Sequence, residues 1–351
     1  MNTNAGKSSV IGGLIGGAGL FIIVFGMKLT SSILSPILLA VIIAISVDPL
    51  ANWLERKGLS SGLVLIVTLI VMFLVIVGVI VLIGYSVSGM IASVPQYTDN
   101  LQGQNDNLQT FLNGSGIDAT SLQGIDFSPL MIYVGSLFGD IFGLFSGLLI
   151  MLIVFIFLLL STPGLTSKMK TDFAADSPTL ARFRGLANDL REYVSITTGI
   201  NFLVGAVNAV FLLILGVDFA ILCGFLAFLL GYIPGVGFWL ALIPPTALAF
   251  LEFGATKALI VLIGYVVING GVQNFIQPKL MGAGLNLSPL VVVLSLFFWS
   301  WVLGPMGALL AVPLTMIVKD VLLDAYDDTR GLADLISADS PSKPAPDESA
   351  D

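Results

Sequence analysis

The longest apolar run in the chain constrains the fold most strongly. From Ser61 to Met90 there is no charged residue, and Val, Ile and Leu fill most positions. A membrane-spanning helix needs about 20 such residues, and in hydrocarbon a single segment satisfies its own backbone hydrogen bonds only as a helix. We therefore expect this segment to cross a membrane and to tilt or project into water with its surplus length.

Comparable runs elsewhere predict further membrane spans. Only 10% of the residues are charged and 56% are hydrophobic, whereas a soluble domain is about one quarter charged. We predict an all-α, polytopic membrane protein of about eight transmembrane helices, with broken or re-entrant helices in the C-terminal half. The run 219–250 is either one broken span or a re-entrant hairpin. The other runs are Val10–Phe25, Ser31–Ser46, Gly135–Leu160, Ile196–Leu215, Ala258–Gly271 extended to Gln277, and Pro289–Val318.

The positions of the basic residues predict the topology. No Lys or Arg lies between Lys57 and Lys168, and cytoplasmic loops carry the excess of Lys and Arg. Both termini are therefore expected in the cytoplasm. The expected regions are 1–162, N-terminal membrane helices with an external polar loop at about 94–128; 163–194, a cytoplasmic amphipathic helix or a plain connector packed on the protein; 195–322, the C-terminal bundle; and 323–351, an acidic, disordered tail.

The first candidate site is a break in the apolar run 219–250. Gly231, Pro234, Gly235 and Gly237 interrupt the helix pattern within seven residues. Backbone groups freed by such a break must be covered by protein or water, and broken membrane helices often expose them to a substrate or an ion. We expect this segment to line a substrate path. A tight turn at the membrane edge is the alternative.

The second candidate site is a stripe of amide side chains. Asn269, Gln273 and Gln277 recur every four residues, with Asn274 beside them, so that a helix would present them on one face. Lipid cannot satisfy amides, which predicts that this face lines a cavity. Interhelical hydrogen bonding is the alternative. Pro278 and Lys279 follow directly, and Lys279 either contacts substrate or extends to the surface.

Composition excludes several classes of function. The chain has no histidine and one cysteine, which removes histidine-based zinc sites, Ser-His triads and intramolecular disulfides. There is no phosphate-binding loop and no nucleophile elbow, so we expect neither an enzyme nor a bound cofactor or metal. A net charge of -8 argues against nucleic acid as a partner. We find no strong internal repeat, and broken segments are expected in the second half alone.

Four motifs of the second half stand in a recognisable order. They are Gly231-Tyr-Ile-Pro-Gly-Val-Gly237, Gln273-Asn-Phe-Ile-Gln-Pro-Lys-Leu-Met-Gly282, Leu287-Ser-Pro289-Leu, and Gly304-Pro-Met-Gly307-Ala-Leu-Leu-Ala-Val-Pro313-Leu. Together they resemble the autoinducer-2 exporter family of bacterial permeases. The resemblance implies a multi-pass protein of the bacterial inner membrane that forms a homo-oligomer, with a pentamer as one candidate. It also marks Gly282, Pro289, Gly304, Gly307 and Pro313 as structural motif positions.

Three functions remain open at this point. The leading hypothesis is a secondary exporter of a small hydrophilic molecule such as the quorum-sensing signal autoinducer-2, because amides bind neutral polyols. The alternative is a monovalent cation (sodium or lithium)/proton antiporter, which needs a titratable carboxylate within the bundle, with Asp140 and Asp218 as candidates. A membrane scaffold without transport is the third possibility.

Overall fold

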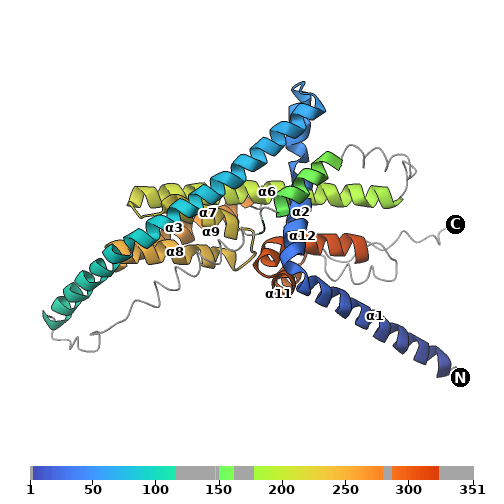
Figure 1. Ribbon diagram of the computed structural model, residues 1–351. Coiled ribbons are helices and arrows are strands. Elements are labelled where there is room, and N and C mark those ends of the chain that lie inside the picture. The colour runs from blue at the N-terminus through green and yellow to red at the C-terminus, as the bar shows by residue number, and fades with distance from the viewer. Residues whose placement is uncertain are drawn as a thin grey trace, which may run out of the picture. The chain divides into compact units, whose positions relative to one another are not determined.

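The protein is helical wherever its structure is described. The computed structural model describes residues 3–114, 150–161, 178–277 and 287–323, together with Gly147 and Lys279. Every regular element in this part is a helix (Figure 1), which confirms the all-α prediction. The elements are α1 (Thr3–Leu29), α2 (Ser31–Arg56), α3 (Ser61–Gly114), α6 (Pro178–Leu215), α7 (Ala220–Leu230), α8 (Gly237–Phe253), α9 (Ala255–Gly271), α11 (Pro289–Leu303), α12 (Pro305–Val318) and the π-helices η3 (Val272–Ile276) and η4 (Lys319–Leu323).

Helix length and hydropathy agree with a polytopic membrane protein. Three described segments are long and apolar enough to cross a membrane, namely Ser61–Ser86, Phe183–Leu215 and Ala255–Ile276. Four shorter apolar helices accompany them: Ile150–Ser161, Ala220–Leu230, Gly237–Phe253 and Pro289–Leu303. The number of eight spans stays a prediction.

The first two predicted spans are joined by a sharp bend and not by a loop. The predicted spans 10–25 and 31–46 belong to α1 and α2, which meet at Thr30 with a bend of 91°. The hydroxyl of Thr30 donates to the carbonyl oxygen of Gly26 at 2.8 Å. The backbone N–H of Thr30 donates to the same carbonyl at 3.1 Å, so both donors of Thr30 bond to the last turn of α1.

Two helices extend well beyond a membrane span. α3 continues as a helix through Gly114, so that the first part of the predicted external polar loop is helical. α6 joins the predicted amphipathic segment to the predicted fifth span without a break. The amphipathic segment is therefore the first part of a long helix and not a separate element.

The described residues belong to two compact units. The first unit comprises Met1–Asp48, Gly147–Leu190 and Asn286–Asp351, and the second comprises Pro49–Ser146 and Arg191–Leu285. In the first unit, the hydroxyl of Ser35 on α2 donates to the carbonyl of Leu303 on α11 at 3.2 Å. The ammonium of Lys28 lies 3.9 Å from the ring centre of Trp301, which ties α1 to α11.

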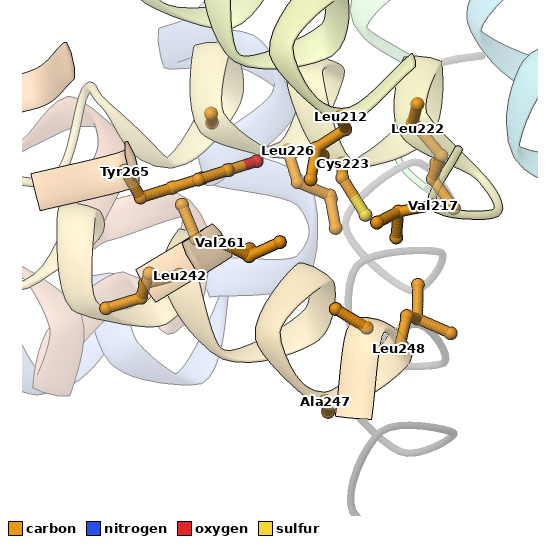
Figure 2. Close-up of a cluster of buried hydrophobic side chains, with 14 of the residues drawn as sticks. Leu212, Val217, Leu222, Cys223, Leu226, Leu242, Ala247, Leu248, Val261 and Tyr265 are labelled. Atoms are coloured by element: carbon orange, nitrogen blue, oxygen red, sulfur yellow. The ribbon is translucent and has the colours of Figure 1, made fainter. Parts of the chain in front are cut away.

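The second unit is built on a helical hairpin. α7 and α8 pack against each other, and α8 packs against α9 beyond the turn at Gly254. The run 219–250 is therefore two short helices and not one broken span. Figure 2 shows the apolar core that α6, α7, α8 and α9 share, and α3 lies beside α7 and α8 (Figure 1). The core side chains include Leu212, Cys223, Leu226, Leu248, Val261 and Tyr265.

The first unit contains a second hairpin with the same landmarks. α11 and α12 pack against each other across Gly304. One constant offset in sequence relates Ala220 to Pro289, Gly235 to Gly304, Pro244 to Pro313, and Thr246 to Thr315. The two glycines have φ of 74° and 70°, a conformation that favours glycine. The structure thus reveals a local repeat that the sequence analysis did not find.

Candidate functional site

The predicted break Gly231–Gly237 forms the turn of the α7–α8 hairpin. Its backbone bonds locally: the N–H of Ile233 donates to Leu230 at 2.9 Å and that of Gly237 to Ile233 at 3.0 Å. Gly235 adopts φ of 74°, and a Cβ at Gly237 would collide with the carbonyl of Leu230. The turn geometry therefore accounts for both glycines, and they carry less information about a ligand than the sequence suggested.

Polar side chains of α6 face this turn, and the sequence analysis did not single them out. A Cβ built on Gly231 would lie 2.5 Å from Oδ1 of Asn201, so the amide of Asn201 occupies the space that the glycine leaves. One turn earlier on α6, the hydroxyl of Thr198 lies 2.6 Å from that of Tyr232, in the hairpin turn. These two contacts join α6 to the turn through polar groups.

Asn201 belongs to a buried polar row on α6. Thr197, Asn201 and Asn208 are all less than a tenth exposed and lie on one side of the helix. The Nδ2 of Asn201 has no hydrogen-bond partner, and neither amide atom of Asn208 has one. Helical spacing of polar residues inside an apolar run was the signal available in the sequence.

α6 and α7 approach closely beside Asn208. A Cβ on Gly205 would lie 2.6 Å from the carbonyl oxygen of Gly224, and a Cβ on Gly224 would lie 2.5 Å from the Cβ of Ala209. Small residues allow such an approach of two helix backbones. The contact excludes lipid from the polar row.

The structure separates the predicted amide stripe. Asn269 is buried and its Nδ2 donates to the carbonyl of Tyr265 at 2.8 Å. Gln273 and Asn274 are exposed, and the Nδ2 of Asn274 donates to Gly270 at 2.8 Å. The segment from Val272 is a π-helix, in which the wider turn moves residues four apart off a common face. Asn269 therefore points into the second unit and its predicted neighbours point outward.

The remaining predicted positions near the stripe lie at its end. Gln277 is partly buried and Lys279 is exposed. The side chain of Pro278 and the structure of Gly282 lie outside the described residues. The structure therefore adds no contact for Lys279 with the α6 row.

The other motif positions shape the second hairpin. Pro289 occupies the first turn of α11, and the hydroxyl of Ser288 accepts from the N–H of Val291 at 3.4 Å as a helix cap. A Cβ on Gly307 would collide with the carbonyl of Trp299, and Pro313 lies inside α12. These residues have evident structural roles.

A cluster of ionisable groups lies at one end of the second unit. The backbone N–H of Asp218 donates to both carboxylate oxygens of Glu252 at 3.1 Å, and the hydroxyl of Tyr97 donates to Oδ2 of Asp218 at 3.1 Å. The ammonium of Lys257 donates to the carbonyl of Leu215 at 3.0 Å. Burial raises the pKa of Glu252 to about 7; the hydrogen bond from the Asp218 backbone N–H opposes the rise, the charge of Asp218 adds to it, and the charge of Lys257 opposes it. Asp218 itself is exposed in the short loop between α6 and α7.

Comparison with known proteins assigns the chain to a family. The sequence profile of the AI-2E family transporters matches residues 18–327. The AI-2 transport protein TqsA of Escherichia coli K12 is 33% identical over 321 residues, which cover 91% of this chain and 93% of TqsA. A candidate transport protein of Haemophilus influenzae is 32% identical over 92% of this chain and 95% of its own length. The candidate transport protein YhhT of Escherichia coli K12 is 29% identical over 86% and 87%.

The family profile and the three relatives each match most of the chain, and the relatives align over most of their own length. The helical hairpins, the bend at Thr30 and the buried polar row of α6 all fall within the matched residues. The chain therefore belongs to the AI-2E family of transporters.

Proposed function

We propose that this transporter is a secondary exporter of a small, uncharged, hydrophilic molecule, with autoinducer-2 as the first candidate. The observation that carries the proposal is the row of buried amides on α6 that faces the turn of the α7–α8 hairpin. Amides whose hydrogen bonds are unmet in an apolar interior are costly. Their presence is explained if a ligand with hydroxyl or carbonyl groups completes those bonds.

The chemistry of the row favours an uncharged substrate. Among the described residues, the buried polar side chains are hydroxyls and amides, and no charged side chain belongs to the buried set. A charged substrate would lose its hydration there without a counter-charge. The name of the related TqsA specifies transport of AI-2, which supports testing this molecule first.

The proposal includes the cellular setting. We place the protein in the bacterial inner membrane with about eight spans and with both termini in the cytoplasm, because Lys and Arg are absent between Lys57 and Lys168. We also propose a homo-oligomer. Epitope accessibility on intact and permeabilised cells tests the position of the termini, and light scattering in detergent tests the subunit number.

Flux of labelled autoinducer-2 in proteoliposomes tests the function itself. We expect wild-type protein to transport it, and Asn201→Leu to reduce the rate about tenfold through loss of hydrogen bonds made by the amide. Asn188→Leu serves as the matched control, because Asn188 is exposed on the same helix. Equal flux in empty liposomes and in liposomes with wild-type protein would refute the proposal.

The two carboxylates named for the antiporter alternative do not support it, because Asp218 is exposed in a loop and Asp140 lies outside the described residues. The described carboxylate that comes nearest to its requirement is Glu252, which is half-buried at the end of α8. Cation-induced dye dequenching in inverted vesicles would decide between an antiporter and an exporter.

A further inference from the structure

The most anomalous side chain in the second unit is Asn208. It is 0% exposed, and neither its Oδ1 nor its Nδ2 has a hydrogen-bond partner. An amide left in this state destabilises a fold, and a leucine of similar shape would fit an apolar site better. Asn208 therefore needs a partner that the folded chain does not supply in this state.

A second unpaired group lies in the same core. Tyr265 on α9 is 0% exposed and its hydroxyl has no partner. Its ring extends from α9 toward Leu226 and Cys223 of α7 (Figure 2). The hydroxyl therefore lies in the part of the core that α6, α7 and α9 share.

The register of α6 against α9 brings these groups to one level. Gly264 abuts the ring of Phe211, and Val272 packs with Val204. The two helices therefore run antiparallel, and the positions midway between these contacts face each other. Asn208 on α6 lies at the level of Tyr265 and Asn269 on α9.

α7 is the third helix that borders the core at the level of Asn208. Gly224 packs directly on Gly205 and Ala209, which flank Asn208 on α6. This close approach leaves no room for a ligand between the two backbones, so a ligand that enters from this side requires α6 and the hairpin to separate. Cys223, the single cysteine of the chain, is fully buried beside this contact.

We infer that Asn208, Tyr265 and Asn269 form a second, deeper binding site for a small uncharged molecule bearing several hydroxyl or carbonyl groups. This inference rests on the proposed function and divides the substrate path in two. The first position is at Asn201 and the hairpin turn, and the second is at Asn208, seven residues or about 10 Å further along α6. An amide that only joined helices would be bonded in the closed state, whereas Asn208 is not.

The first arm of the test compares Asn208→Leu with Asn188→Leu in purified protein. Removing an unpaired buried amide raises the thermal midpoint by about 2–4 °C, while the export of autoinducer-2 falls at least about tenfold. Asn188→Leu leaves the rate unchanged. A lower midpoint in Asn208→Leu would show that the amide has a structural partner, and unchanged export would show that it does not contact substrate. Either result overturns the inference.

The second arm uses Cys223 as a native reporter of opening. A small polar thiol reagent is expected to modify Cys223 slowly in wild-type liposomes, and autoinducer-2 is expected to slow the reaction several-fold. Asn208→Leu is expected to abolish this protection. Modification at the same rate with and without autoinducer-2 would overturn the site for that ligand.

The two proposals fail separately. Export by wild-type protein with no effect of Asn208→Leu refutes the deeper site and leaves the exporter in place. No export by wild-type protein refutes the exporter, and the protection of Cys223 by glycerol and by D-ribose then decides the site. Protection that is lost in Asn208→Leu supports it, and no protection by any of the three molecules overturns it.

Discussion

Replacement of Glu252 by glutamine should change how the stability of the protein depends on pH. Glu252 lies in the last turn of α8, and its carboxylate accepts the backbone N–H of Asp218. Burial raises its pKa from an ordinary 4.5 to about 7. Between these values the folded protein holds a proton that the unfolded chain releases, so the free energy of unfolding falls as the pH rises from 4.5 to 7 and is level on either side.

The size of this effect follows from the shift. A pKa change from 4.5 to about 7 corresponds to roughly 3 kcal/mol at full value, and the side chain is only half-buried, which reduces the effect on unfolding to about 1–2 kcal/mol. Glu252→Gln removes the titration. We expect the variant to match wild type near pH 4.5 and to be more stable than wild type by about this amount at pH 8.

Thermal unfolding in detergent at pH 5, 6, 7 and 8 measures the difference, with the four tryptophans as a fluorescence signal. Glu55→Gln is the control for loss of a carboxylate, because Glu55 is exposed at the end of α2. The other ionisable groups that interact with Glu252 in the described structure are Tyr97, Asp218, Cys223 and Lys257. A difference between variant and wild type that is the same at all four pH values would refute the reasoning.

Three further comparisons between variants test the packing of the hairpins. Gly224→Ala places a Cβ 2.5 Å from that of Ala209 and should destabilise the protein by about 1–3 kcal/mol in denaturant unfolding. Gly78→Ala places a Cβ on α3 that meets nothing within 4 Å and should stabilise the protein by about 0.5–1 kcal/mol; the reverse order of stability would contradict the packing. Tyr232→Phe removes the bond to Thr198 and should cost about 1 kcal/mol; in a Thr198→Val background the same change should cost much less, and an equal cost in both backgrounds would show that the bond is not the reason. Trp299→Phe removes the 3.0 Å bond to Thr315 and should cost about the same by thermal unfolding, while an unchanged midpoint would show that the bond contributes nothing.

The sequence was sufficient to predict those features that follow from the membrane environment and from local backbone restrictions. An uncharged run such as Ser61–Met90 has few alternatives to a membrane helix, and Gly and Pro at 231–237 require an interruption. The sequence alone did not distinguish a helical hairpin from a broken span as the form of this interruption. A hairpin and a broken span differ in whether α7 folds back against α8, and this packing contact is not specified by the turn residues alone.

The amides do not share one face, for a geometric reason, while their place in a substrate path stays a prediction. The i, i+4 rule assumes an α-helix, and the π-helix from Val272 leaves only Asn269 of the stripe in the core. For Asn201 and Asn208 the sequence offers only their helical spacing within an apolar run. Their burial depends on Gly231 in the hairpin turn and Gly224 on α7, which bring a second backbone close to α6.

The two hairpins allow one last distinction between packing and function. Thr315 on α12 accepts from Trp299 and donates to Ala311 at 2.7 Å, so its hydroxyl is fully used within the first unit. The hydroxyl of Thr246, the matching residue on α8, is buried with no hydrogen-bond partner. Two hairpins with the same glycine turn and proline thus differ in whether their polar groups are satisfied. Buried polar groups without hydrogen-bond partners destabilise a fold unless a ligand completes their bonds. Because such groups lie on α6, α8 and α9, we propose that the α7–α8 hairpin is the one that handles substrate.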